Sequence, residues 1–334
     1  MTNTNLEMMS SASTLHNKVS VTTSARLHMG FFDLNGGLGR RFGSIGVALQ
    51  TPTISLTAFP EQTFSAEGVG ANRAVQIAEQ LAQDLKIKLG MHIKLDRVIP
   101  EHAGLGSGTQ LSLAVGMAMS RLYDLDLSVN QIAALTKRGM RSGVGLGTFA
   151  QGGLIVDGGR ATNSEVPPVI ARADFPEDWP ILLIFDQQHQ GVHGAEEVSA
   201  FKNLPEFPAE SSAILCRHVL MQALPAIVER DLKAFGEAIQ ALQAMTGDYF
   251  APAQGGSRYT SPRVASALNL LKENGVYCFG QSSWGPTGFA VFENQTQADI
   301  CLQQLRLKFA AETALQFVLT AANNQASRIQ ASKI

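Results

Sequence analysis

The sequence predicts an α+β protein made of two domains, on the basis of three observations. The chain has 334 residues, about twice the length of a typical domain. Segments with strand-type alternation and segments with helical periodicity follow one another along its whole length. Between residues 160 and 180 the composition shifts to Pro, Asp, Glu and Ala, and we place the domain boundary there. We therefore expect a flexible tail at 1–18, an N-terminal domain at 19–165, a C-terminal domain at 166–325 and a second tail at 326–334.

The first half alternates strands with helices. A strand is expected at 18–34, where the apolar run ends at Asn-Gly-Gly, and a pair of strands at 44–59, with a turn at Thr51-Pro52. Residues 109–123 are apolar almost all round, which predicts a helix buried on most faces. The other expected elements are a helix at 72–88, a strand at 91–100, a helix capped by Ser128 that ends near Met140, and a Gly-rich stretch at 142–159 with strand character at its end.

The second half repeats this mixture of strands and helices. Residues 179–186 form a continuous apolar run typical of a buried strand. After it we expect helices near 209–224, 229–246, 261–274 and 296–310, and strands at 276–281, 288–293 and 314–320.

The composition excludes several classes of partner. Twenty-six Lys and Arg face 28 Asp and Glu, for a net charge of -2, so no overall charge attracts nucleic acid or an anionic membrane. No apolar run reaches the roughly 18 residues of a spanning helix, and the N-terminus lacks the apolar core of a signal peptide. Cys216, Cys278 and Cys301 are odd in number and far apart, which disfavours a disulfide framework. We expect a cytoplasmic protein.

One Gly-rich loop has the composition of an anion site. The expected strand 91–100 is followed by Glu-His-Ala-Gly-Leu-Gly-Ser-Gly-Thr and then by the buried helix. Glycines let the backbone N–H groups approach a ligand closely, and the start of a helix adds unpaired N–H groups and a positive dipole end. The pattern lacks the GKS or GKT ending of a Walker loop and the GxGxxG of a dinucleotide loop. The residues expected to cradle a phosphate or pyrophosphate are Gly104, Gly106, Ser107, Gly108 and Thr109.

Three blocks together resemble the GHMP superfamily, named for galactokinase, homoserine kinase, mevalonate kinase and phosphomevalonate kinase. They are SARLHMGFFDL (24–34), the loop with Pro100 and Gly104–Ser107, and GQSSWGPTGFAVFE (280–293). With GSIGVAL and GVGLGTFAQGGLIVDGG, these blocks look most like the GHMP family of β-ribofuranosylaminobenzene 5'-phosphate synthases, which serve methanopterin biosynthesis. The resemblance implies an N-terminal domain like ribosomal protein S5 domain 2, a ferredoxin-like C-terminal domain, an active site between them, and a homodimer.

The resemblance also implies a reaction that is not phosphoryl transfer. Phosphoribosyl pyrophosphate loses pyrophosphate at the anomeric carbon, and the ring carbon of 4-aminobenzoate or 4-hydroxybenzoate that bears the carboxylate attacks. Carbon dioxide then leaves, and the product is a C-riboside 5'-phosphate. Many GHMP kinases place a catalytic aspartate just before the GG-strand block, whereas residues 143–153 contain no acidic residue. An ATP-dependent GHMP small-molecule kinase and a non-catalytic ligand sensor on the same scaffold remain the alternatives.

Charge stabilisation and positioning dominate such a mechanism, because an oxocarbenium-like centre and a pyrophosphate leaving group develop. We expect Arg26, His28 and His102 to act as catalytic groups. Arg40, Arg41 and Arg141 are expected to bind anions, since the guanidinium fork matches phosphate and carboxylate. A solvated face is the alternative for the Arg40-Arg41 pair, and a role at a helix C-terminus for Arg141 and Arg138. Ser107 is a candidate ligand for Mg²⁺ bound to phosphate oxygens.

An aryl substrate needs flat apolar walls, for which Trp284 in the third block and Tyr259 are candidates, with core packing as the alternative for both. Ser283 and Gly285 flank Trp284 and are expected to belong to the same substrate pocket. His193 and Glu197 lie in a Gly-containing segment that we expect to close over the site as a loop. The alternative for that segment is a metal site formed by His189 and His193, which are four residues apart.

Overall fold

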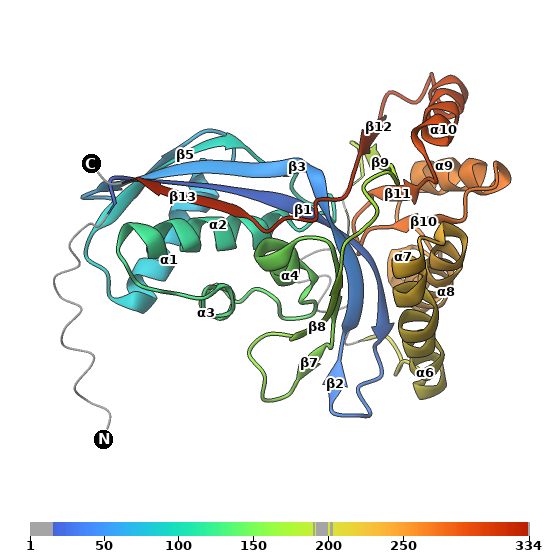
Figure 1. Cartoon of the computed structure of the whole chain (residues 1–334), viewed down its shortest axis with the longest axis horizontal. Coiled ribbons are helices and arrows are strands. Elements are labelled where there is room, and N and C mark those ends of the chain that lie inside the picture. Colours follow the sequence, from blue (N-terminus) through green and yellow to red (C-terminus); the bar gives the residue numbers. More distant parts are fainter. Residues whose placement is uncertain (1–15, 190, 192–199, 201–202, 333–334) are drawn as a thin grey trace.

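Two long antiparallel strands, β1 (Lys18–Asp33) and β3 (Gly43–Glu61), run through both halves of the molecule. The computed structural model of the chain describes residues 16–332 apart from 190, 192–199 and 201–202. In Figure 1 β1 starts beside α1 and α2 and bends toward the helices of the second half, and β3 runs antiparallel to it in the opposite direction. Each strand therefore belongs to one sheet while packing against two groups of helices.

The larger sheet has seven strands and lies mainly in the first half. Its path is β13-β1-β3-β5-β4, and β6 pairs with β3 and then with β8. A separate two-stranded ladder joins β2 to β7. The remaining strands of these two sheets are β2 (Arg40–Arg41), β4 (Ser65–Glu67), β5 (Gly90–Arg97), β6 (Leu154–Asp157), β7 (Arg160–Ala161), β8 (Val169–Ala173) and β13 (Arg328–Ser332).

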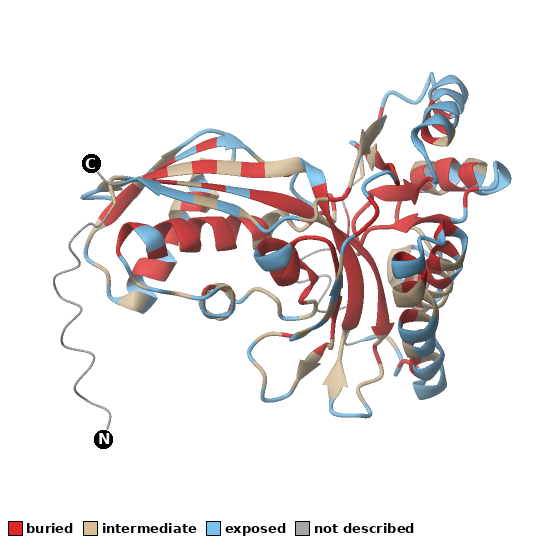
Figure 2. Cartoon of the chain, in the orientation of Figure 1, coloured by how far each residue is buried: buried red, intermediate tan, exposed pale blue. Residues whose placement is uncertain are grey.

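Four helices pack on this sheet: α1 (Ala71–Leu85), α2 (Ser107–Leu122), α3 (Val129–Leu135) and α4 (Val144–Gln151). Helix α2 is buried on nearly every face, because it lies between β1 and β3 on one side and α1, α3 and α4 on the others. Figure 2 shows it as an almost continuous buried segment. This confirms the expectation drawn from its apolar sequence.

The second half is a four-stranded antiparallel sheet, β10-β11-β9-β12, with helices on its faces. Its strands are β9 (Ile181–Asp186), β10 (Cys278–Gln281), β11 (Gly288–Val291) and β12 (Leu315–Thr320). The helical segments are α6 (Ala209–His218), the π-helical η2 (Val219–Ala223), α7 (Leu224–Glu229), α8 (Leu232–Phe250), the 3₁₀ turn η3 (Ala251–Gln254), α9 (Pro262–Glu273) and α10 (Gln295–Lys308).

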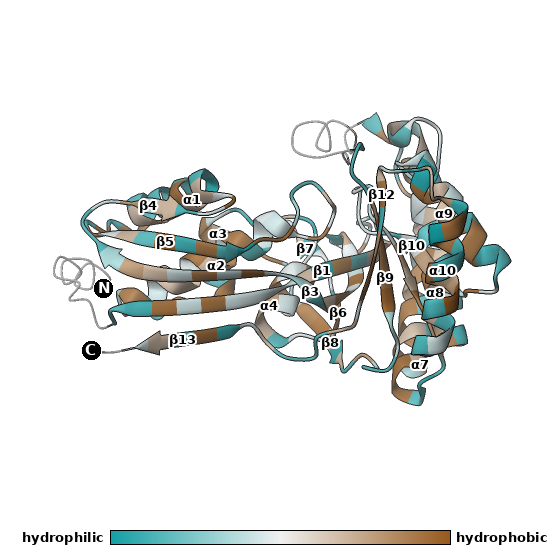
Figure 3. Cartoon of the chain, turned by 90° about the horizontal axis from the view of Figure 1, so that it is seen from above, coloured by the Kyte–Doolittle hydropathy of each residue, from teal (hydrophilic) through white to brown (hydrophobic). Residues whose placement is uncertain are grey.

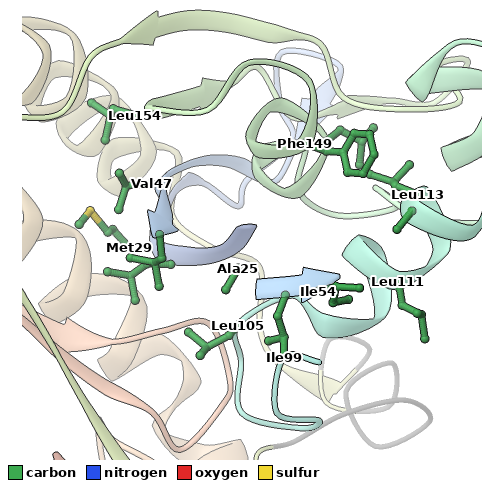
Figure 4. Close-up of a cluster of buried hydrophobic side chains, with 14 of the residues drawn as sticks. Ala25, Met29, Val47, Ile54, Ile99, Leu105, Leu111, Leu113, Phe149 and Leu154 are labelled. Carbon is green, nitrogen blue, oxygen red and sulfur yellow. The ribbon is translucent and has the colours of Figure 1, made fainter. Parts of the chain in front are cut away.

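One hydrophobic core spans both halves. Along the long strands of the first half, apolar and polar residues alternate (Figure 3), so one face of the sheet meets the helices. Figure 4 shows the central part, where Ala25 and Met29 from β1, Val47 from β3 and Leu105 from the Gly-rich loop gather with residues of α2 and α4. A smaller second cluster lies between β9 and the helices α9 and α10, around Ile184 and Leu268.

Residues 49–52 interrupt the β1–β3 ladder without turning the chain. Ser24 of β1 pairs with Thr53, but Arg26 pairs with Ala48, so β3 bulges between these positions. The predicted turn at Thr51-Pro52 is therefore wrong. Proline cannot donate to a ladder, yet pairing with β1 resumes on both sides and the strand continues. Instead, the bulge is covered by the C-terminal segment, where the Gln50 N–H donates to the Ala321 carbonyl over 2.8 Å.

Several boundaries differ from the predictions. The helix capped by Ser128 has the expected cap but ends at Leu135, and the Gly-rich stretch contains the unpredicted helix α4. The predicted tail at 326–334 is wrong, since β13 pairs with β1 over five residue pairs. The predicted domain boundary at 165 lies before β8, yet β8 pairs with β6 and so belongs to the seven-stranded sheet of the first half. A single sequence carries no signal for such pairing between segments far apart.

One helical stretch among the described residues, Ala209–Glu229, is long and apolar enough by composition to cross a membrane. Its 18-residue window has a mean hydropathy of 1.3, and 33% of it is buried in the protein. This finding qualifies the expectation that no stretch reaches that length. A single helix of this kind does not define a membrane protein, because the core helix of a soluble protein passes the same test.

Truncation tests the role of β13. Removing residues 328–334 should lower the free energy of unfolding by a few kcal/mol, because each net hydrogen bond of the lost ladder contributes about 1 kcal/mol. Urea unfolding followed by circular dichroism measures the change. Removing residues 333–334 alone is the matched control and should leave stability unchanged; equal stability of both truncated chains would refute the structural role.

Candidate active site

The Gly-rich loop between β5 and α2 presents the open N-terminus of a buried helix. Gly106 is the N-cap residue, adopts φ +78°, and supplies no side-chain cap. Gly104 also has a positive φ, +73°, which glycine adopts without strain. The first-turn N–H groups of α2 therefore point out of the helix, and the helix dipole makes this end attractive to anions.

Arg26 anchors this loop to β1. Its backbone N–H donates to the Leu105 carbonyl over 3.1 Å, and its guanidinium donates to the Gly104 carbonyl. A Cβ atom at Gly106 would lie only 2.8 Å from Cγ of Arg26. The arginine side chain and the loop thus fill the space between them, which explains why glycine is required at 106.

The third block, from the second half of the chain, closes on the same loop. Ser282 Oγ donates to the Gly104 carbonyl over 2.8 Å and accepts from the His28 backbone N–H over 3.1 Å. A Cβ atom at Gly285 would lie 2.5 Å from Cα of Gly104. The three sequence blocks therefore meet at one point, and two glycines allow backbones from the two halves to touch.

A cleft of about 530 Å³ opens beside this junction, which we call the basic cleft. Its described lining carries four basic side chains and two histidines but no carboxylate. The described lining thus carries more positive than negative charge, which suits an anionic ligand. The lining residues are Arg26, His28, Phe31, His102, Gly104, Thr109, Lys137, Arg138, Gly139, Met140, Arg141, Ser142, Gly191, Ser283, Trp284 and Gly285.

Two guanidinium groups crowd the start of α2. A Cβ atom at Gly108 would lie 2.4 Å from Nη2 of Arg73 and 3.4 Å from Nη1 of Arg138. Burial, and then the charge of Arg73, lower the pKa of Arg138. Arg73 also forms an ion pair of 2.7 Å with the exposed Glu101. Like charges held this close favour a bound anion, which relieves their repulsion.

Behind the cleft, the buried Asp157 holds the loop that carries Arg141 and Ser142. Its Oδ2 accepts from the hydroxyl of Ser44, from Ser142 Oγ over 3.3 Å and from the Gly143 N–H over 3.0 Å. Its Oδ1 accepts from the Gly159 N–H over 2.9 Å. Burial raises the pKa of Asp157 to about 6, although these four donors oppose the rise. The carboxylate therefore fixes the N-terminus of α4 next to the cleft.

A much smaller hollow continues from the cleft between β1 and α8, and we call it the aromatic recess. It measures about 30 Å³ and is lined by His28, Gly30, Phe31, Gln243, Thr246, Gly247, Phe250, Gln254, Arg258, Gln281, Ser283 and Trp284. His28, Phe31, Ser283 and Trp284 line both hollows and so mark their junction. The rings of Phe250 and Trp284 pack edge to face at 4.6 Å.

His28 is 1% exposed, and neither ring nitrogen has a hydrogen-bond partner among the described residues. Burial, and then the charge of Arg26, lower its pKa well below the usual value, so the imidazole is neutral at neutral pH. Register shifts of β1 against β3 flank it, between Ser24 and Arg26 and between His28 and Gly30. Irregularities of this kind re-aim side chains, and here they accompany the two charged or polar residues that β1 gives to the site.

The structure brings most of the predicted site residues together. Arg26, His28, His102, Gly104, Thr109, Arg141, Ser283, Trp284 and Gly285 line the basic cleft, and Gly106, Ser107 and Gly108 form the adjoining start of α2. Arg141 and Arg138 lie beyond the end of α3 rather than on a helix, which corrects the helix C-terminus alternative. His193 and Glu197 lie outside the described residues.

Arg40 and Arg41 are not in the cleft, contrary to the prediction. Arg40 donates to the carbonyls of Gly158 and Gly159, each over 2.8 Å, and Arg41 donates to the Leu34 carbonyl over 2.6 Å. Both lie in β2, which pairs with β7. Sequence analysis missed Lys137 and Ser142, which lie beside Arg138 and Arg141 in the loop before α4. Their proximity to two arginines was the available signal.

No group of three or more His, Cys, Asp or Glu side chains suited to a metal ion occurs among the described residues. The cleft offers hydroxyls and imidazoles, whereas Mg²⁺ prefers one or two carboxylates together with substrate phosphates. The described residues therefore do not fit a Mg²⁺ ion held by the protein alone.

Comparison with known proteins identifies the class. Residues 72–152 match the family model for the N-terminal domain of GHMP kinases, and residues 223–311 match the model for their C-terminal domain. A homoserine kinase from Cytophaga hutchinsonii superposes with a TM-score of 0.67 over 95% of this chain and 99% of its own, at 16% identity. The chain belongs to the GHMP superfamily, and the predicted α+β GHMP fold is confirmed.

Comparison with curated relatives shows which family within the superfamily the chain belongs to. The chain is 36% identical over 294 residues to the β-ribofuranosylphenol 5'-phosphate synthase of Archaeoglobus fulgidus, covering 81% of this chain and 87% of the relative. It is 35% identical over 300 residues to the synthase of that name from Methanocaldococcus jannaschii, covering 81% and 88%. The chain belongs to this synthase family and is an enzyme of that class, which confirms the resemblance drawn from the sequence blocks.

The titration of Asp157 gives a stability prediction. Its folded pKa of about 6 lies above the ordinary 3.8, so the folded chain binds the proton more tightly. The corresponding stabilisation is complete below pH 3.8 and is lost as the pH rises to about 6, a change of roughly 3 kcal/mol at 1.36 kcal/mol per pKa unit.

Asp157→Asn cannot titrate, so the stability of the wild type relative to this variant should fall between pH 4 and 6 and then stay level. Urea unfolding at several pH values measures both proteins, and other titrating groups cancel in the difference. A difference that does not vary with pH would contradict the raised pKa.

Proposed function

We propose that this chain condenses phosphoribosyl pyrophosphate with 4-hydroxybenzoate or 4-aminobenzoate, releasing pyrophosphate and carbon dioxide. The product is a C-riboside 5'-phosphate, the type of intermediate used in methanopterin biosynthesis. The family supports a pentosyltransferase of that pathway. These relatives are named as synthases of a ribofuranosylphenol, and a phenol product favours 4-hydroxybenzoate as the acceptor.

The observation that carries the proposal is the charge of the basic cleft. Arg26, Lys137, Arg138 and Arg141 line it without any carboxylate among its described residues, and the open N-terminus of α2 adjoins it. Phosphoribosyl pyrophosphate presents a phosphate at one end and a pyrophosphate at the other, and the acceptor adds a carboxylate. A site that gathers three anionic groups needs this excess of donors.

The same donors suit the chemical step. Departure of pyrophosphate from the anomeric carbon leaves an oxocarbenium-like ribose and a more highly charged leaving group. N–H groups of α2 and the guanidinium groups stabilise the charge that develops on pyrophosphate. The fixed cleft also holds the acceptor ring against the anomeric carbon, which removes the entropic cost of bringing two substrates together. No covalent nucleophile is required.

The described site lacks the aspartate that many GHMP kinases use as catalytic base. Residues 143–153 comprise α4 and the two glycines before β6 and contain no acidic residue, and the described cleft lining adds none. Asp157, the nearest buried carboxylate, is occupied by four donors behind the cleft. A phosphoryl acceptor hydroxyl would therefore find no carboxylate within the described lining.

Mg²⁺ remains a prediction. We propose that the ion enters bound to the pyrophosphate oxygens, with Ser107 at the start of α2 as the nearest hydroxyl, and we route no step through it. Homodimer formation remains a prediction from the family resemblance, and light scattering of the purified protein tests it. The cytoplasmic location remains a prediction from the composition.

Turnover tests the function directly. Purified protein with Mg²⁺, phosphoribosyl pyrophosphate and carboxyl-labelled 4-hydroxybenzoate should release labelled carbon dioxide and pyrophosphate in equal amounts. Labelled 4-aminobenzoate should give the same two products. ATP hydrolysis dependent on a small alcohol, without label release, would instead support a kinase, and ligand binding without any turnover would support a sensor.

Arg138→Gln should raise the KM for phosphoribosyl pyrophosphate about 10- to 100-fold, since a hydrogen bond to a charged group contributes roughly 1.5–3 kcal/mol. The free energy of unfolding of this variant should not fall, because the substitution also removes the repulsion between Arg138 and Arg73. Steady-state kinetics at saturating acceptor measure the change. Arg306→Gln, an exposed arginine in the last turn of α10, is the matched control. An unchanged KM in the Arg138 variant would place the pyrophosphate elsewhere.

A further inference from the structure

We propose that His28 accepts the proton of the acceptor's 4-hydroxyl group as the ring attacks ribose, and returns it to the phenolate product. The inference rests on the proposed function and adds two things to it: the place of the acceptor in the site and the group that activates its ring. It follows from the position of one buried imidazole between two hollows of very different size.

The imidazole of His28 is the first part of the argument. It lies at the junction of the basic cleft and the aromatic recess, is 1% exposed, and leaves both ring nitrogens without a hydrogen-bond partner among the described residues. A buried polar group without a partner is costly, and such groups are rare unless a ligand completes them. The imidazole is therefore positioned to form a hydrogen bond with a polar group of the substrate.

Four other polar side chains of the recess are already engaged. Gln243 donates to the carbonyls of Met29 and Gln281, and Gln281 Oε1 accepts from Thr260. Thr246 donates to the Leu242 carbonyl, and Arg258 forms a two-pronged ion pair with Asp248 at 2.8 Å. These bonds hold the walls in place, while the nitrogens of His28 remain available.

The size of the recess selects what enters it. A volume of 30 Å³ exceeds the roughly 10–15 Å³ that holds one water molecule but is far too small for a benzene ring. A hydroxyl or amino group fits. The ring itself then lies at the mouth, where Phe31 and Trp284 line both hollows and supply flat apolar walls.

The chemistry fixes the direction of the ring. The attacking carbon is the one that bears the carboxylate, so it must face the anomeric carbon and the cations of the basic cleft. The 4-substituent lies at the opposite end of the ring and points away from the cleft. The aromatic recess opens from the cleft on the side of His28, which places this substituent against the imidazole.

The protonation state of His28 suits this role. Burial and the charge of Arg26 keep the imidazole neutral, so that it can accept a proton. A neutral imidazole is a weak base toward a free phenol. As the ring carbon forms its bond to ribose, however, positive charge spreads to the 4-oxygen and its proton becomes strongly acidic, and a weak base then suffices.

The step balances. An imidazole nitrogen of His28 takes the hydroxyl proton, and the O–H electron pair forms a C=O bond at ring position 4. Ring electrons form the carbon–carbon bond to the anomeric carbon while pyrophosphate leaves with its bonding pair. The bond from the ring to the carboxylate then breaks, carbon dioxide departs, and its electron pair restores the aromatic ring. The phenolate finally takes the proton back from the imidazolium.

The amino acceptor supplies an internal comparison. A 4-amino group can donate its lone pair and carry the resulting charge as an iminium group without losing a proton. His28→Phe keeps an aromatic ring beside Phe31 but removes the acceptor nitrogen. We expect kcat/KM to fall about 10²- to 10⁴-fold with 4-hydroxybenzoate, the usual range for general-base catalysis, and about tenfold with 4-aminobenzoate.

An acidified acceptor separates loss of the base from damage to the site. 3,5-Difluoro-4-hydroxybenzoate ionises without help at neutral pH, so the His28→Phe variant should lose much less activity with it, relative to wild type, than with 4-hydroxybenzoate. His28→Gln, which keeps a hydrogen-bond acceptor but is not a base, should bind 4-hydroxybenzoate with nearly unchanged KM and lose kcat. His92→Phe, on β5 and outside both hollows, is the matched control.

Equal losses with all three acceptors, in both His28 variants, would overturn the proposal and leave His28 a packing residue. If the wild type released no carbon dioxide from either acceptor, the proposed function itself would be refuted, and this inference, which rests on it, would be refuted as well. Thermal unfolding of each variant shows whether the fold is kept, and the ratio between acceptors within one variant does not depend on the amount of folded enzyme.

Discussion

The carbonyl of Gly104 is the contact on which the site depends. It accepts from the Arg26 guanidinium of β1 and from Ser282 Oγ of the third block, so one backbone oxygen joins three segments from both halves of the chain. Gly104 and Gly285 touch backbone to backbone, which no larger residue would allow. Because the halves are fixed to each other here, the start of α2 and both hollows keep one geometry.

Electrostatic strain follows from that junction. Arg26, Arg73 and Arg138 converge on the Gly-rich loop, where Arg73 pairs with Glu101 and the described cleft lining contributes no carboxylate. The cost is offset elsewhere, by the shared core of the two halves and by the buried network around Asp157 that holds the neighbouring loop. Under the proposed function, a site arranged in this way needs little reorganisation to bind a phosphate group, and such preorganisation favours reactions in which charge separates.

Much of the site could be predicted because its signals are local. Glycines at 104, 106 and 108, followed by an apolar helix, predict a loop with exposed N–H groups at a helix start from backbone chemistry alone. The basic pair at 40 and 41 gave an equally strong local signal and failed, since its guanidinium groups satisfy carbonyls of Gly158, Gly159 and Leu34. Local composition shows that a side chain is charged, and only the fold shows whether a protein acceptor already holds it.

The sequence by itself determined the α+β class, most helices and strands, the Gly-rich loop before the buried helix and the family, because these depend on periodicity and on short blocks of fixed spacing. The tertiary structure decided which distant segments meet. It brought β13 back to the first strand, turned 49–52 into a bulge rather than a turn, and left the His28 ring nitrogens, between two hollows, without a hydrogen-bond partner among the described residues. Those outcomes depend on contacts between residues far apart in the chain, and no local pattern encodes them.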